Sequence, residues 1–148
     1  MRLAALGALG AVALMMAPTA GAADGAALFK QHCAICHQDS AGGTVGLAPS
    51  LLGEHWQRLG AERGYLPTVL LRGLSGPIKT AGGPFNGNMP AFAGALDDEA
   101  LAAVATHLRG LQGAAADKPF AAADFAEART RPGNPAQTRA LRRQILGE

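Results

Sequence analysis

The chain has 148 residues, a length that allows one domain with room for a short appendage. It is rich in alanine and glycine, and aromatic residues make up only 5% of it, which favours short helices and loops over a sheet. The formal net charge is +2, so the totals give no polybasic footprint for nucleic acid or for an acidic membrane surface.

Residues 1–22 are typical of a secretory signal peptide. Arg2 supplies the positive start, residues 3–17 form an apolar core, and Ala20-Gly21-Ala22 is a small-residue cleavage site. A membrane anchor is the alternative, but a spanning helix needs about 18 or more apolar residues, and this run is shorter. We therefore expect cleavage before Ala23, a periplasmic mature chain and no stable membrane insertion.

Residues 24–38 predict the first helix. Asp24 can cap its start, and Leu28, Phe29 and Cys33 recur at helical spacing on one side. We expect this side to pack into the core.

The end of this segment carries the motif Cys33-Ala34-Ile35-Cys36-His37. The spacing C-x-x-C-H is the attachment signature of a c-type haem, in which two thiols add to the vinyl groups of one porphyrin. The adjacent histidine can supply an axial nitrogen to the iron. The sequence therefore predicts one haem c, held covalently through Cys33 and Cys36.

Three other interpretations of the motif compete with haem attachment. A thioredoxin-like redox pair belongs near a βαβ pattern, and none is visible in this sequence. A zinc site would need a second pair of ligands, and the chain has no further cysteines. A disulfide would close a tiny, strained loop, so haem attachment is favoured.

Residues 41–53 are rich in glycine and proline and predict a loop, and residues 54–74 predict two short helices. Trp56, the single tryptophan, could donate its indole N–H to a haem propionate or lie in the core with its N–H on a carbonyl. Both alternatives stay open. His55 falls in a polar stretch, which favours a surface histidine over an iron ligand.

Residues 80–92 contain three glycines and two prolines, a composition that predicts an irregular loop. Within it, Met89 is the only methionine that follows the predicted signal peptide. A methionine in such a loop is better suited to be a ligand than to fill a core. We therefore predict Met89 as the second axial ligand, over His55, His107 or an open site.

Residues 97–111 predict the clearest helix, with Asp97 and Asp98 at its start and an apolar stripe along one face. Residues 114–148 fall outside the predicted haem domain of residues 23–113. This C-terminal extension is expected to be partly helical or disordered, with a helix over residues 135–146. It either packs back on the domain or serves as a docking arm for a partner.

These motifs resemble those of the small soluble class I bacterial cytochromes c. The resemblance covers residues 24–113 and is carried by the C-x-x-C-H motif, by Gly25 and Phe29 before it, and by Asn88-Met89-Pro90. It implies an all-α fold of three to five short helices wrapped around one covalently bound haem c.

The same resemblance implies a set of roles. His37 and Met89 would be the axial iron ligands, and the carbonyl of Pro49 would accept the ring N–H of His37. Gly25 would let the last helix of the domain cross closely over the first. One departure is His107, which stands where the family usually has tyrosine or tryptophan.

A His/Met pair saturates the iron, which suits an electron carrier and not an enzyme. The expected partners are redox proteins: a dehydrogenase, a quinol-oxidising complex or a terminal oxidase or reductase. Two alternatives stay open, a cytochrome subunit of a periplasmic dehydrogenase complex and a haem protein with an open sixth site for ligand sensing or catalysis.

Overall fold

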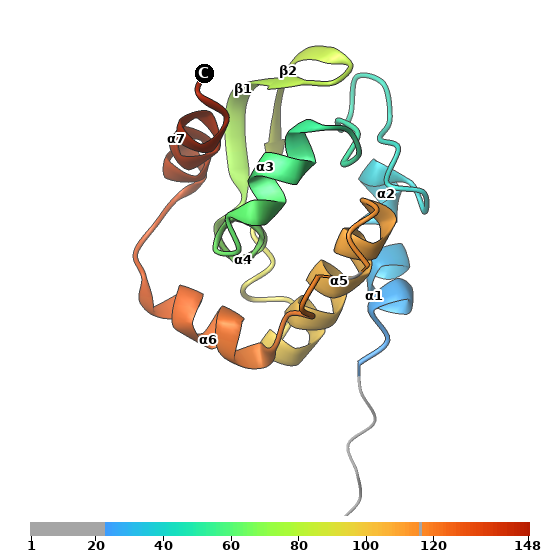
Figure 1. Cartoon of the computed structure of the whole chain (residues 1–148), viewed down its shortest axis with the longest axis vertical. Coiled ribbons are helices and arrows are strands. Elements are labelled where there is room, and N and C mark those ends of the chain that lie inside the picture. The colour runs from blue at the N-terminus through green and yellow to red at the C-terminus, as the bar shows by residue number, and fades with distance from the viewer. Residues whose placement is uncertain (1–22, 116) are drawn as a thin grey trace, which may run out of the picture.

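The computed structural model describes residues 23–115 and 117–148, and the predicted signal peptide, residues 1–22, lies outside them. This part of the chain forms seven helices and one antiparallel β-hairpin (Figure 1). None of these helices is long and apolar enough to cross a membrane. The helices are α1 (Gly25–His32), α2 (Ala34–His37), α3 (His55–Ala61), α4 (Tyr65–Arg72), α5 (Asp98–Leu111), α6 (Ala122–Thr130) and α7 (Pro135–Leu146), and the strands are β1 (Leu74–Thr80) and β2 (Gly83–Met89).

The predicted first helix is divided into two. Asp24 caps α1 as expected, because its side chain accepts the backbone N–H groups of Ala26 and Ala27. At Cys33 the backbone leaves helical geometry, with φ of −117°, and α2 follows for a single turn. The prediction of one helix over residues 24–38 is therefore wrong at this residue. Side-chain periodicity cannot reveal a departure by one residue, since the apolar positions stay on the same side.

Helices α1 and α5 cross closely at Gly25. A Cβ atom at this position would collide with the carbonyl oxygen of Ala103 on α5. Beside the crossing, the rings of Phe29 and His107 lie 5.5 Å apart between centroids. The close crossing at a glycine is confirmed, and His107 supplies the ring that packs on Phe29.

We expect Gly25→Ala to destabilise the protein by about 1–3 kcal/mol, the usual cost of overpacking a core. The collision involves backbone on α5, so no side-chain rotation can relieve it. Guanidinium unfolding followed by circular dichroism measures the change. Gly110→Ala is the matched control on α5, because a Cβ there meets nothing within 4 Å and alanine favours helix. Equal stability of the two variants would contradict the close crossing.

The segment predicted to be an irregular loop instead forms most of a β-hairpin. Strand β1 pairs with β2 in a regular register, with Leu74 opposite Met89 and Thr80 opposite Gly83. The prediction for residues 80–92 is therefore wrong over residues 83–89. A two-stranded ribbon contains only edge strands, where a missing proline N–H is tolerated, so Pro77 and Pro84 fit within it.

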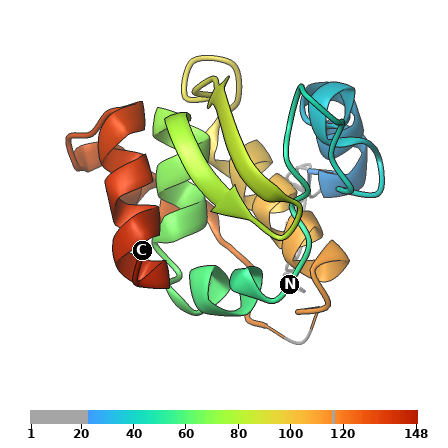
Figure 2. The same ribbon diagram turned by 90° about the horizontal axis from the view of Figure 1, so that it is seen from above.

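Helices α6 and α7 pack back on the rest of the molecule (Figures 1 and 2). Helix α6 lies against α5 and α4, and α7 lies against β1, α4 and α3. The helix predicted over residues 135–146 is confirmed as α7. Arg72 on α4 donates to the carbonyl groups of Ala128 and Arg129 at the end of α6, at 3.2 and 3.0 Å. These contacts join the C-terminal segment to the helices before it.

Candidate functional site

One large apolar cavity lies among α1, α2, α4, α5 and the β-hairpin, with α3 and α7 on its far side. It encloses about 1370 Å³ of space not filled by protein atoms, its open mouth included. Its apolar lining comprises Phe29, Leu51, Trp56, Leu66, Val69, Leu70, Leu74, Ile78, Phe85, Phe92, Val104 and Leu108. Such a wall accommodates a large, flat, apolar group.

All five residues predicted for the site line this one cavity: Cys33, Cys36, His37, Pro49 and Met89. They come from α2, from the residue just before it, from the loop that follows it and from the end of β2. The fold therefore joins two stretches of chain that are about fifty residues apart in the sequence.

His37 is the last residue of α2 and is only 7% exposed. Its Nδ1 donates to the carbonyl oxygen of Pro49 at 3.0 Å. A carbonyl can only accept, so the ring proton lies on Nδ1 and Nε2 keeps its lone pair. Burial lowers the pKa of His37, against a smaller opposite effect of the Pro49 hydrogen bond. The ring is therefore held as the neutral imidazole, which is the form that binds metals.

The loop after α2 fixes the position of Pro49. Gly43 adopts a φ of +82°, and a Cβ on it would lie 2.6 Å from the carbonyl carbon of Pro49. The backbone N–H of Gly43 donates to the carbonyl of His37 at 2.9 Å. A glycine is needed here both for the backbone conformation and for the close approach. This contact brings the Pro49 carbonyl over the His37 ring.

Both cysteines are free thiols; Cys33 is buried and Cys36 is half-buried. Burial, followed by the neighbouring Cys36, raises the pKa of the Cys33 thiol to about 11. Thiol–disulfide exchange depends on a lowered pKa, so a thioredoxin-like role is disfavoured. Among the described residues no group of three or more His, Cys, Asp or Glu side chains could hold a metal ion, which also disfavours the zinc interpretation.

Met89 ends strand β2 and is half-buried in the wall of the cavity. Its position is fixed on both sides along the chain. It is paired with Leu74 in the hairpin, and three residues later the N–H of Phe92 donates to the carbonyl of Leu70 on α4 at 2.8 Å. The thioether is thus placed by a strand end and not by an irregular loop.

The other candidate residues divide into those inside and those outside the cavity wall. His107 packs on Phe29 and is not among the lining residues. His55 is half-buried and lines the cavity; burial, followed by the charge of Arg142, lowers its pKa, against an opposite effect of Glu148. Trp56 also lines the cavity, is 6% exposed, and its buried Nε1 has no hydrogen-bond partner. The indole N–H therefore does not lie on a carbonyl, as one of the two alternatives required.

Sequence reasoning missed one residue of the wall, Arg142 on α7. It is only 2% exposed, and its Nη2 donates to the carbonyl of Lys79 on β1 at 2.8 Å. Arginines are common on exposed helix faces, so nothing in the residue type or in its spacing along α7 marked this one as buried.

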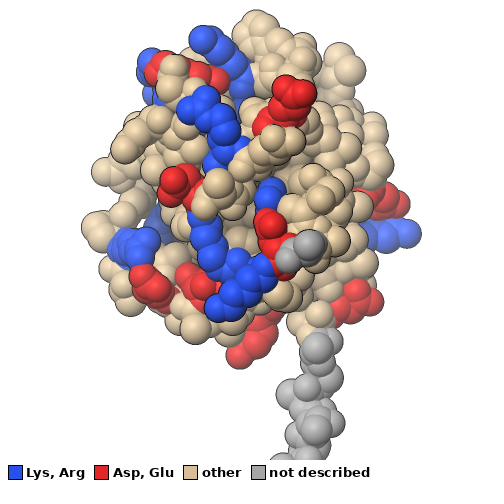
Figure 3. Space-filling view, in the orientation of Figure 1, with Lys and Arg blue, Asp and Glu red and all other residues tan. Residues whose placement is uncertain are grey.

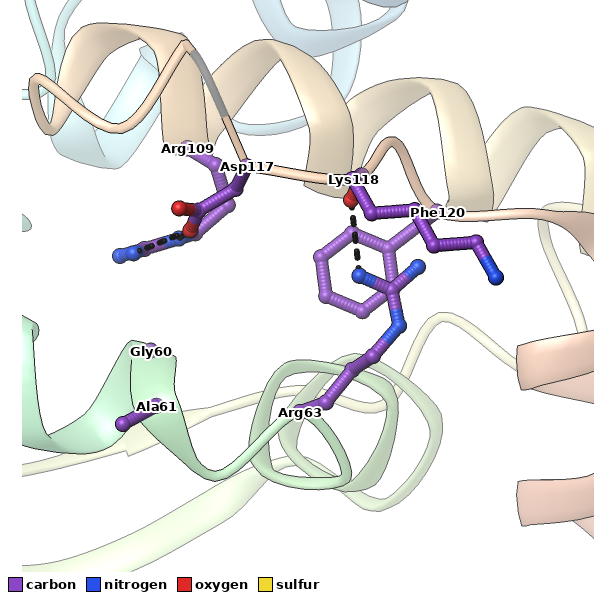
Figure 4. Close-up of a pocket in the computed structure, with 7 residues that line it drawn as sticks. All are labelled: Gly60, Ala61, Arg63, Arg109, Asp117, Lys118 and Phe120. Atoms are coloured by element: carbon purple, nitrogen blue, oxygen red, sulfur yellow. Dashed lines mark hydrogen bonds and ion pairs between the residues drawn. The ribbon is translucent and has the colours of Figure 1, made fainter.

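A second hollow lies between α5 and the turn after α3 and is braced by arginines (Figure 4). Arg109 forms an ion pair with Asp117 at 2.8 Å. Arg63 donates to the carbonyl of Lys118 at 2.8 Å and stacks over the ring of Phe120. Both guanidinium groups are thus engaged by the chain itself, so this hollow is a structural junction.

Comparison with known proteins gives consistent matches. Residues 22–112 match the model of the family described as Cytochrome c. The chain is 40% identical over 129 residues to a protein named cytochrome c-552 from Thermus thermophilus, and the match covers 83% of this chain and 97% of that protein. It is also 40% identical to the cytochrome c-552 of a further strain of the same species, over 83% of this chain and 86% of the relative.

Proposed function

Since the chain belongs to the cytochrome c family, we propose that it is a periplasmic mono-haem electron carrier whose iron is held by His37 and Met89. The family implies a covalently bound haem c, and Cys33 and Cys36 have the spacing that attachment requires. The signal-like sequence of residues 1–22 supports export to the periplasm.

The residues around the cavity fit a haem. Its walls are apolar, both thiols and the neutral His37 ring line it, and the unpaired N–H of Trp56 lies at its wall. The arrangement offers two attachment points, one nitrogen ligand, one sulfur ligand and a polar donor. The single observation that carries the proposal is that His37, oriented by Pro49, shares this cavity with Met89.

The protein side of the mechanism follows from these positions. The bound iron supplies one-electron chemistry, with a potential that a thioether ligand raises. Pro49 holds the His37 ring in one tautomer and orientation, and the hairpin and α4 hold Met89 in place. The apolar walls keep water away from both ligands. A site whose ligands stay fixed in both oxidation states exchanges electrons with little reorganisation and leaves no position for a substrate.

Partner proteins would approach where the cavity meets the surface. Ile35 and Leu47 both line the cavity and are 81% and 56% exposed, so they offer an apolar contact for a redox partner. On the face of the molecule seen in Figure 3, basic and acidic side chains are interleaved. Such a face suits weak, transient contacts better than strong binding of a highly charged partner.

We expect the purified protein to be red and to show a weak far-red absorption band in its oxidised form, which reports sulfur bound to iron. The band should vanish on reduction, and carbon monoxide should not bind to the reduced protein on mixing. Optical spectra of both oxidation states measure this. Carbon monoxide binding would favour a haem protein with an open sixth site, and a colourless exported protein would overturn the proposal altogether.

A further inference from the structure

Helix α7 brings a buried arginine to the wall of the haem cavity. Arg142 is 2% exposed, and α7 lies beyond residues 22–112, the part of the chain that matches the family. Its Nη2 is bound to the carbonyl of Lys79, but its buried Nε has no hydrogen-bond partner. Trp56 Nε1, on the same cavity, is the other buried side-chain atom without a partner in the described part of the chain.

These two unpaired donors require an explanation. An unsatisfied buried N–H costs about 1–3 kcal/mol, and a buried charge without a counter-ion costs more. Among the described residues that line the cavity, Arg142 is the one Lys or Arg, and none is Asp or Glu. None of the ion pairs within residues 23–115 and 117–148 involves Arg142. An anion that belongs to a bound group would satisfy both donors.

The chemistry of haem supplies such an anion at the correct edge. The two vinyl groups that react with cysteines lie on one side of the porphyrin, and the two propionate carboxylates lie toward the other. Helix α2, next to Cys33 and Cys36, and helix α7 lie on opposite sides of the β-hairpin in both ribbon views (Figures 1 and 2). A porphyrin attached at the cysteines would therefore direct its carboxylates toward α3 and α7.

We propose that Arg142 forms an ion pair with a haem propionate, which Trp56 Nε1 also contacts, so that the C-terminal helix is part of the haem site. This inference rests on the proposed function and names a binding residue outside the family's own segment. Arg142 Nε would donate to the carboxylate while Nη2 keeps its bond to Lys79. The arginine is a positioning residue, since it acts on the iron through the propionate.

The ion pair has a measurable consequence for the reduction potential. The positive charge of Arg142 offsets the propionate charge and keeps that carboxyl ionised, so the potential of the native protein should be constant from about pH 4.5 to 7. In Arg142→Gln the uncompensated carboxylate stabilises the oxidised iron and lowers the potential at pH 7. As the pH falls the carboxyl becomes protonated, and the potential should rise toward the native value.

Other titratable groups face this part of the cavity and must be separated from the propionate. They are His55 on α3, Tyr65 on α4, Lys79 on β1, Glu148 after α7 and His32 at the end of α1. Burial raises the pKa of Tyr65, against the charge and hydrogen bond of Arg142, so it stays protonated throughout this range. A His55→Gln background removes the nearest group that could titrate in the same window.

The experiment is redox titration of the haem-loaded protein from about pH 4.5 to 8, a range that spans carboxyl titration. The variants are Arg142→Gln alone, Arg142→Gln with His55→Gln, and Arg142→Lys, which keeps a charge. Arg143→Gln is the matched control, since Arg143 is the next residue of α7 and is exposed. We expect a lower, pH-dependent potential only in the two Arg142→Gln proteins, and a pH-independent potential in Arg142→Lys.

A native-like potential and a flat pH profile in Arg142→Gln would overturn the inference, as would equal shifts in Arg142→Gln and Arg143→Gln. If Arg142→Gln yields no holoprotein, a crystal structure of the oxidised native protein decides. Nε within hydrogen-bond distance of a propionate supports the proposal, and any other partner rejects it. Failure of the proposed function is distinct, because it would remove the haem or the far-red band from the native protein itself.

Discussion

Replacing Met89 by alanine should open the iron of this protein and lower its reduction potential. No other methionine follows residue 22, so no second thioether can take the vacated position. We expect the far-red band to disappear and the reduced protein to bind carbon monoxide on mixing. The potential should fall by more than about 0.1 V, a fraction of the roughly 0.8 V that axial ligands span. Optical spectra and redox titration measure both effects.

The control is Ile78→Ala, on the strand opposite Met89. Ile78 also lines the cavity and is half-buried, so its truncation removes apolar contact without removing sulfur. The far-red band should persist in this variant. Persistence of the band in Met89→Ala would mean that Met89 does not ligate the iron. A native-like low-spin spectrum without that band would point instead to a nitrogen ligand such as His55, which lines the same cavity.

Local signals explain what could be predicted of the fold. Asp97 accepts the N–H of Ala100 and begins α5 at the expected residue, and Asn134 caps α7 in the same way. Both helices also carry an apolar face of helical period, so start, end and orientation were written within one short stretch of chain. The crossing at Gly25 depended on family resemblance, because a glycine alone does not name the helix that passes over it.

The errors have equally physical causes. The β-hairpin was missed because glycine and proline usually interrupt structure, whereas a ribbon of two edge strands tolerates both. The break at Cys33 leaves the side-chain pattern unchanged. Arg142 was missed because its burial depends on where α7 docks, and that is a property of the whole fold. Contiguous motifs such as Cys33 to His37 are legible in a sequence, but a wall assembled from distant helices is not.

The docking of the C-terminal segment leads to the second large expected effect. Phe125 on α6 is completely buried in the main core, and its ring meets Phe120 edge-on at 6.1 Å. We expect Phe125→Ala to lower the free energy of unfolding by about 3–5 kcal/mol, as for other fully buried aromatics. If residues 114–148 are part of one cooperative unit, this loss must also appear in the haem environment, far from α6 in the sequence.

Guanidinium unfolding followed by circular dichroism and by haem absorbance tests this expectation. Both probes should give the same transition, shifted to lower denaturant concentration in Phe125→Ala. Leu111→Ala is the control, since Leu111 is 36% exposed and its truncation should change stability by no more than about 0.5 kcal/mol. A haem transition unaffected by Phe125→Ala would contradict the packed arrangement and revive the docking arm. A shared transition would mean that α7, and with it Arg142, is held at the haem cavity by the same core that holds α5 against α1.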